Sequence, residues 1–310
     1  MNIGDFELIE PVPEMSNTIA IGMLRPWIDV GRVGTVALDK LQENLGAKEL
    51  AYLEKPGKYF DYTRYRPRAR VENGRRILKK PNTNVYHALD KNSGRNYIFI
   101  HIREPHSNGE EYVESILKLF EYCNVTEYCR VGGMYDSVPH TRPILVTGSM
   151  TKEQEGLAGS LLNPRKSTYQ GPTSILNLVN QELTKNKINN STLMAHLPQY
   201  VQLDRDHLGA TRILEVLCAV YGFSTTVIDR DVGIQQYKDI DKSINYSSEV
   251  GTLIKQLETY YDRVLAKGKN PTDEMSIDSL SASSVNFSPD VEDFLNEMGE
   301  RFEKSDDLED

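Results

Sequence analysis

The stretch that decides the fold is TIAIGMLRPWIDVGRVGTVALDKLQENLG, residues 18–46. It opens with an apolar run typical of a buried strand, residues 18–24, which ends at a bend rich in glycine and proline. Residues 30–45 then repeat apolar side chains at helical spacing, and Gly46 is placed to end the helix. A strand that leads directly into a helix predicts an α/β protein.

The same alternation of strands and helices continues along the chain. Residues 59–78 alternate β-forming and charged residues, and the Asn73-Gly74 pair in their midst predicts a tight hairpin, because both turn positions need positive φ. Strands are predicted at residues 49–53, 96–103, 125–131, 144–150 and 193–197, and helices at 110–123 and 174–187. This order predicts an α/β fold with a mixed, mainly parallel sheet flanked by helices.

The chain divides into three parts on this reading. Residues 1–203 form the α/β core domain, and residues 204–267, whose pattern is wholly helical, form a C-terminal helical bundle that packs on the core. Residues 268–310 comprise a linker, a short amphipathic helix at 288–304 and an acidic tail that we expect to be disordered. From residue 271 to the end there are thirteen acids against two bases, a net charge of −11, so residues 1–270 carry about +2 of the total of −9.

Composition excludes several classes of protein. No basic face suits nucleic acid, and no stretch reaches the ~18 apolar residues of a membrane span. The acidic N-terminus is not a signal peptide, and the three cysteines lack the spacing of a disulfide framework or a zinc site. The histidines are scattered, without the spacing of metal ligands. We therefore expect a cytoplasmic protein with no cofactor and no metal.

The bend after the first strand contains three candidate site residues, Trp27, Gly31 and Gly34. Such a bend can bind an anion, because backbone N–H groups and the helix dipole point at one spot. The sequence from Gly31 to Gly34 is neither a Walker A loop nor a full dinucleotide fingerprint. The alternative is a tight, closely packed turn, with Trp27 covering a subunit contact.

A second cluster of candidates is Asp136, His140 and Arg142, on a loop stiffened by prolines. These side chains could orient a general base beside an oxyanion or phosphate. Alternatively, His140 and Arg142 bind buried carbonyls and pair with Asp136 or Asp61, which locks a loop that shapes an interface. The sequence has no serine or cysteine at a recognisable nucleophile elbow, so we assign no catalytic residue.

A third candidate, Arg66, belongs to an arginine row with Arg64, Arg68 and Arg70, which share one face if they lie on a strand. A row of like charges is costly unless acids face it, so the row could meet a charged partner surface, with the acidic tail as one source. The alternative is a solvated hairpin face.

Five segments, read together and in order, resemble the proteasome assembly chaperone 2 family in its prokaryotic branch, which is sometimes labelled ATP-grasp superfamily. They are GMLRPWIDVGRVGTVALDKL (22–41), KYFDYTRYRPRAR (58–70), GGMYDSVPHTRP (132–143), TYQGPTSI (168–175, which contains Tyr169) and HLPQYV (196–201). The hexapeptide VPHTRP is the most specific. One departure is Gln199, where the family pattern has a histidine.

The resemblance implies a fold similar to the nucleoside phosphorylase type, a C-terminal helical bundle and homo-oligomers. Eukaryotic and archaeal relatives escort proteasome subunits. We therefore expect a non-catalytic, chaperone-like assembly scaffold that binds itself and a protein client, with a proteasome-related client as the first candidate. The alternative is a small-molecule or nucleotide-binding enzyme with a phosphorylase-like pocket near Trp27, Asp61, His140 and Arg142.

Overall fold

The computed structural model describes residues 1–310 except 73, 166–170, 245, 247–248 and 267–310. Its strands are β1 (Asn2–Ile3), β2 (Phe6–Leu8), β3 (Thr18–Arg25), β4 (Lys48–Leu53), β5 (Arg68–Glu72), β6 (Arg75–Lys79), β7 (Asn84–Asp90), β8 (Arg95–Arg103), β9 (Val125–Asp136), β10 (Val146–Ser149), β11 (Asn163–Pro164) and β12 (Asn189–Pro198). Its α-helices are α1 (Val33–Leu45), α2 (Gly109–Tyr122), α3 (Lys152–Ala158), α4 (Ile175–Lys185), α5 (His207–Tyr221), α6 (Arg230–Ser243) and α7 (Glu249–Ala266). Tyr169 and the tail expected at 268–310 lie outside the described residues.

Ten strands form one sheet in the order β1-β2-β4-β7-β8-β3-β9-β12-β10-β11. The central strands β8, β3, β9 and β12 are parallel to one another. The neighbouring strands β1, β2, β4, β7 and β8 pair antiparallel in that order, as do β12 and β10. The expected mixed sheet flanked by helices is confirmed. Its mainly parallel character is wrong, because five of the nine pairings are antiparallel.

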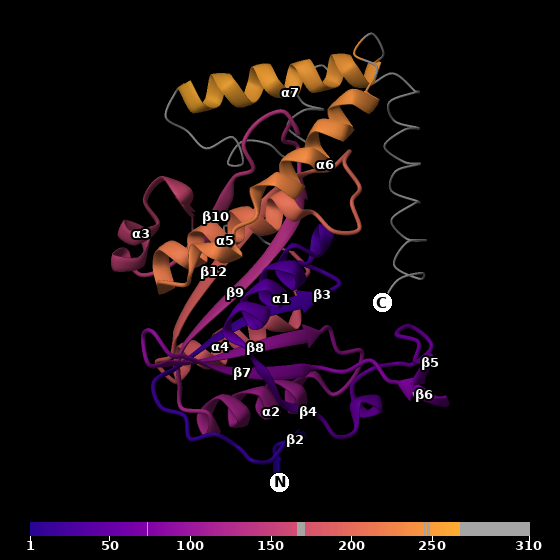
Figure 1. Cartoon of the computed structure of the whole chain (residues 1–310), viewed down its shortest axis with the longest axis vertical. Coiled ribbons are helices and arrows are strands. Elements are labelled where there is room, and N and C mark those ends of the chain that lie inside the picture. The colour runs from indigo at the N-terminus through magenta and orange to yellow at the C-terminus, as the bar shows by residue number, and fades with distance from the viewer. Residues whose placement is uncertain (73, 166–170, 245, 247–248, 267–310) are drawn as a thin grey trace.

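The correction has a physical reason in β7, a strand that the sequence did not predict. Only residues 91–94 separate β7 from β8, and a connection this short can join antiparallel strands but cannot cross over to a parallel one. The hairpin expected at residues 73–74 is confirmed as β5 and β6, with Gly74 at φ 74°. It is a separate two-stranded ribbon that projects from the side of the molecule (Figure 1).

Helices cover both faces of the sheet, and β3 shows how its sequence divides between them. Ile19, Ile21 and Met23 point to the face that α1 and α5 cover, whereas Ala20 and Leu24 point to the face that α2 and α4 cover. Both sets are buried. The uninterrupted apolar run of this strand is therefore the pattern of a strand buried on both sides.

The helix predicted after β3 begins with a 3-10 turn, η1 (Val30–Arg32), and continues as α1. Gly46 ends it in the left-handed conformation at φ 63°, as the sequence predicts. The other 3-10 turns are η2 (Pro56–Lys58), η3 (Gly159–Leu161) and η4 (Thr225–Val227).

The C-terminal helices α6 and α7 lie at the end of the molecule opposite β2 (Figure 1). Leu253, Ile254 and Leu257 of α7 form a small separate core with Tyr200 and Val201, which follow β12. In the part of the chain that the structure describes, no helix is both long and apolar enough to span a bilayer.

Candidate functional site

The loop that carries the VPHTRP hexapeptide connects β9 to β10 and contacts the C-terminal helices. His140 is buried; its backbone N–H donates to the Tyr200 hydroxyl at 2.7 Å, and its Nδ1 lies 2.8 Å from the same oxygen. Its Nε2 is 3.3 Å from the Asp241 carboxylate of α6. Burial lowers the pKa of His140, although Asp241 and Glu258 oppose that shift. A neutral imidazole that accepts from Tyr200 and donates to Asp241 satisfies these contacts.

Arg142 joins the same loop to α7. Its Nε and Nη2 donate to the two carboxylate oxygens of Asp262 at 2.8 and 2.6 Å, and its Nη1 donates to Glu258 at 3.1 Å. The guanidinium lowers the pKa of Asp262. Tyr261 adds a hydrogen bond from its hydroxyl to the carbonyl of Pro143 at 2.9 Å. The loop is therefore tied to α7 by a bidentate ion pair, a geometry that arginine suits better than lysine.

Asp136 contacts neither His140 nor Arg142 through any of these hydrogen bonds; its partner is His196 of β12. The Asp136 carboxylate lies 2.7 Å from His196 Nδ1, and His196 Nε2 lies 2.7 Å from the Thr147 hydroxyl of β10. The order carboxylate–imidazole–hydroxyl is that of a nucleophile triad. However, His196 and Thr147 are 3% and 7% exposed, so the relay links three strands inside the fold. His196 is the first residue of the HLPQYV segment, but no pattern in the sequence predicts that it pairs with Asp136.

The bend after β3 uses its own carboxylate at the start of α1. Asp29 is buried and accepts hydrogen bonds from the backbone N–H and the hydroxyl of Thr35. Burial raises the pKa of Asp29 to about 6, against the hydrogen bonds from Thr35 and the charge of Arg25. The position where the sequence suggested a bound anion is therefore filled by Asp29.

Gly31 and Gly34 permit close packing at this bend. A Cβ on Gly34 would lie 2.9 Å from that of Met23, and Gly31 has φ 56° and would clash with Asp206. The carbonyl of Gly31 accepts from the backbone N–H of Asp206 at 2.7 Å. Arg32 follows Gly31 in the sequence and Arg205 precedes Asp206, so this contact brings the two arginines into one region.

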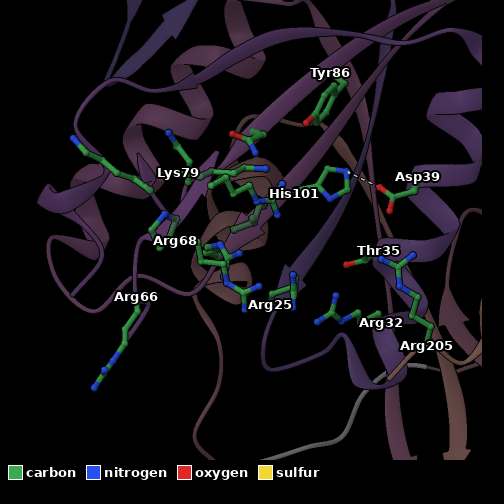
Figure 2. A pocket seen from close by; sticks show the side chains of 17 residues that line it. Arg25, Arg32, Thr35, Asp39, Arg66, Arg68, Lys79, Tyr86, His101 and Arg205 are labelled. Atoms are coloured by element: carbon green, nitrogen blue, oxygen red, sulfur yellow. Dashed lines mark ion pairs between the residues drawn. The ribbon is translucent and has the colours of Figure 1, made fainter. Parts of the chain in front are cut away.

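A cavity of about 280 Å³ lies beside this junction, and arginine and lysine side chains dominate its lining (Figure 2). Among the described residues that line it, nine carry positive charge: Arg25, Arg32, Arg66, Arg68, Arg70, Lys79, Lys80, Arg103 and Arg205. Asp39 is the one acid among them. Of the predicted row, Arg68 and Arg70 lie on β5 and reach the cavity, as does Arg66 before the strand begins. Arg64 ends a turn in which its N–H donates to the Asp61 carbonyl.

The arginines of the cavity act on two other titratable side chains that line it, His101 and Asp39. Burial lowers the pKa of His101 to about 4, and Arg25 and Arg103 add to this shift. The pKa of Asp39 is raised by burial, while Arg205, Arg25 and Arg32 oppose the shift. His101 Nε2 lies 4.0 Å from the Asp39 carboxylate and 2.7 Å from the Gln42 amide. At neutral pH the imidazole is uncharged and leaves the positive potential of the cavity to the arginines and lysines.

The remaining candidates lie apart from one another. Trp27 is 70% exposed at the bend. Asp61 is exposed and accepts hydrogen bonds from the backbone and hydroxyl of Thr63 at 2.8 Å, while its own N–H donates to His106. Within the described residues, no group of three His, Cys, Asp or Glu side chains is placed to hold a metal ion.

Comparison with known proteins decides the family. Residues 23–231 match the model of the PAC2 family, which is more than half of the chain. The chain belongs to the PAC2 family. The resemblance drawn from the five sequence segments is thereby confirmed. The matched range of this PAC2 chain contains four of the segments whole and all of the first except Gly22. No curated protein is similar enough in sequence to be matched.

Solved structures share the fold of this PAC2 protein. A Corynebacterium glutamicum protein of unknown function has 19% identity and a TM-score of 0.74, over 85% of this chain and 99% of its own. A proteasome-assembly chaperone homologue from Mycobacterium tuberculosis has 20% identity and a TM-score of 0.67, over 76% and 99%. An archaeal proteasome activator from Pyrococcus furiosus has 17% identity and a TM-score of 0.57, over 77% and 97%.

Proposed function

We propose that this PAC2 protein is a non-catalytic, chaperone-like assembly scaffold that forms homo-oligomers and holds a protein client. The observation that carries the proposal is the use made of the most specific family loop. Its histidine and arginine are engaged by Tyr200, Asp241, Glu258 and Asp262, so the loop fixes helices instead of presenting a general base to a substrate.

The relatives point to the class of client. Two of the solved structures with this fold are described as a proteasome-assembly chaperone homologue and a proteasome activator. A proteasome subunit or accessory factor is therefore the first candidate client. The finer features implied by the family resemblance belong to the same proposal: a nucleoside-phosphorylase-type fold, an α/β core at 1–203, a helical bundle at 204–267 and a cytoplasmic location.

Exposed apolar side chains support self-association. Trp27, Val71 and Leu78 are 70%, 74% and 65% exposed, and the latter two lie on the projecting hairpin. Large apolar groups on the surface are candidates for burial against another chain.

Light scattering during gel filtration tests the self-association. We expect the unmodified protein to be oligomeric and the triple variant Trp27→Ser, Val71→Ser, Leu78→Ser to be smaller. The control is Leu157→Ser with Leu178→Ser, which removes apolar side chains of α3 and α4 that are 55% and 46% exposed. A monomer at every accessible concentration, or equal dissociation of both variants, argues against these residues as the interface.

An affinity capture from native lysate, read by mass spectrometry, tests the client. Enrichment of proteasome subunits or their accessory factors over a bait-free control supports the proposal. Their absence from repeated captures under crosslinking would exclude a proteasome-related client.

The alternative enzyme reading receives less support. It placed Trp27, Asp61, His140 and Arg142 around one pocket, but the cavity of Figure 2 is lined by none of these four. Its lining instead suggests a ligand site of another kind.

A further inference from the structure

We propose that the cavity bordered by the ends of β3 and β8, the start of α1 and the hairpin binds a small ligand that carries two or more phosphate groups. The inference goes beyond the scaffold function and does not depend on it, because a bound ligand requires no chemistry and no client.

The position in the fold comes first. β3 and β8 are parallel neighbours, but the helix after β3, α1, covers one face of the sheet and the helix after β8, α2, covers the other. The carboxyl ends of these two strands therefore form a topological switch point, where open α/β sheets leave a crevice that binds ligands. Arg25 and Arg103 are the last residues of the two strands, and both line the cavity.

Charge is the second step. Arg25 and Arg103 are register partners on adjacent strands, an arrangement in which like charges repel. Arg32 and Arg205 reach the same region through the contact between Gly31 and Asp206. Arg32 also has φ 50°, a conformation that is uncommon for residues other than glycine. Bringing these side chains together therefore costs free energy in backbone strain and charge repulsion, and such costs are common at functional sites.

The hairpin forms the side of the cavity that faces away from the sheet. Arg68 pairs with Lys79 across β5 and β6, and Arg70 lies two residues further along the same face. All three line the cavity (Figure 2). A ligand is thus met by guanidinium groups from the sheet on one side and from the ribbon on the other.

The class of ligand follows from the donors and the size. Guanidinium groups bind phosphate oxygens in pairs. The lining holds nine cations and one acid, and Asp29 lies 3.8 Å from Arg25, so the excess of positive charge calls for several negative charges on one ligand. A volume of about 280 Å³ lies at the lower end of small-molecule pockets and suits a short phosphate chain or a compact phosphorylated metabolite. Residues 1–270, which contain the cavity, are close to neutral overall, and this favours a small ligand over nucleic acid.

Titration calorimetry of the full chain with sodium tripolyphosphate tests the proposal, with sodium chloride of equal ionic strength as the reference. We expect one saturable site per chain. The variant Arg68→Gln, Arg70→Gln should bind about tenfold more weakly or worse. Arg75→Gln with Arg76→Gln, on the same hairpin but outside the cavity lining, should bind as the unmodified protein does.

A second variant, Arg25→Gln with Arg103→Gln, tests the strand ends, and its melting curve without ligand verifies that it folds. If it does not fold, the hairpin pair alone decides. Absence of saturable binding, equal loss in the Arg75/Arg76 control, or tighter binding of a single-stranded oligonucleotide with dependence on Arg75 and Arg76 would each overturn the proposal.

Discussion

His101 shows how one residue reports its surroundings. Its ring is 18% exposed, and it shares the cavity with arginines that disfavour a second positive charge. Its pKa falls from 6.5 to about 4 for these reasons. In the unfolded chain the same imidazole takes up a proton at a higher pH, so protonation favours unfolding between the two values.

The first prediction is a pH dependence of stability. The stability that the folded protein gains from keeping His101 neutral is fully present above pH 6.5, and it is lost as the pH falls towards about 4. Between pH 7.5 and 5 the free energy of unfolding should fall by about 2 kcal/mol more in the unmodified protein than in His101→Gln. Urea unfolding at both pH values measures this. Equal losses in the two proteins would show that His101 is not the source.

The second prediction concerns Gly132 of β9. A Cβ there would lie 2.2 Å from the carbonyl oxygen of Ile28. The same oxygen accepts a hydrogen bond from the N–H of Gly133 at 2.9 Å, so it is held in place. Gly132→Ala should therefore lower the free energy of unfolding by about 2 kcal/mol or more.

Gly156→Ala is the matched control for that substitution. Gly156 lies in α3 with open space around it, so alanine should stabilise by about 0.5–1 kcal/mol through helix propensity. Chemical denaturation of both variants measures the contrast, and a mild effect at Gly132 would contradict the tight contact.

At the scale of elements, the loop between β9 and β10 acts as a clasp for α7. The apolar side of α7 also packs on Tyr200 and Val201, so the helix has two independent attachments. Loss of the polar one should loosen the helix without unfolding it.

The third prediction follows from that arrangement. Arg142→Lys retains the charge but cannot donate in parallel to both oxygens of Asp262. Hydrogen exchange of the α7 amides should become several-fold faster, while the central strands exchange as before. Arg76→Lys, an exposed change on the hairpin, serves as the control. Unaltered exchange in α7 would mean that the apolar contacts alone hold it.

At the scale of the whole molecule, the charge of the chain is divided. Residues 271–310 carry thirteen acids against two bases, and residues 1–270 are close to neutral. All three apolar clusters lie within the described residues before 267.

The fourth prediction is that deletion of residues 268–310 leaves a folded, oligomeric protein that captures its client less well. The cores lie outside the removed stretch, whereas much of the negative charge lies within it. Circular dichroism, light scattering and affinity capture measure the three properties. A truncated chain that does not fold would refute the division of the molecule.

Several local elements of this protein, and its family, could be predicted from short stretches of sequence alone. The strand and helix of residues 18–46 follow from an apolar run, a helical period and a terminal glycine, and the hairpin follows from Asn73-Gly74. The VPHTRP loop and its companion segments identified the family. Each of these features is read over a few consecutive residues.

The tertiary structure decided what depends on distant partners. His140 meets Asp241 across 101 positions and Arg142 meets Asp262 across 120, and Arg25, Arg103 and Arg205 come together only when the sheet and its helices have packed. The strand β7 is recognised by its neighbours β4 and β8, since its own pattern is weak. Local pattern records the periodicity of an element, whereas the choice of partner is set by packing in three dimensions, and this is why the cationic cavity could not be located from the chain alone.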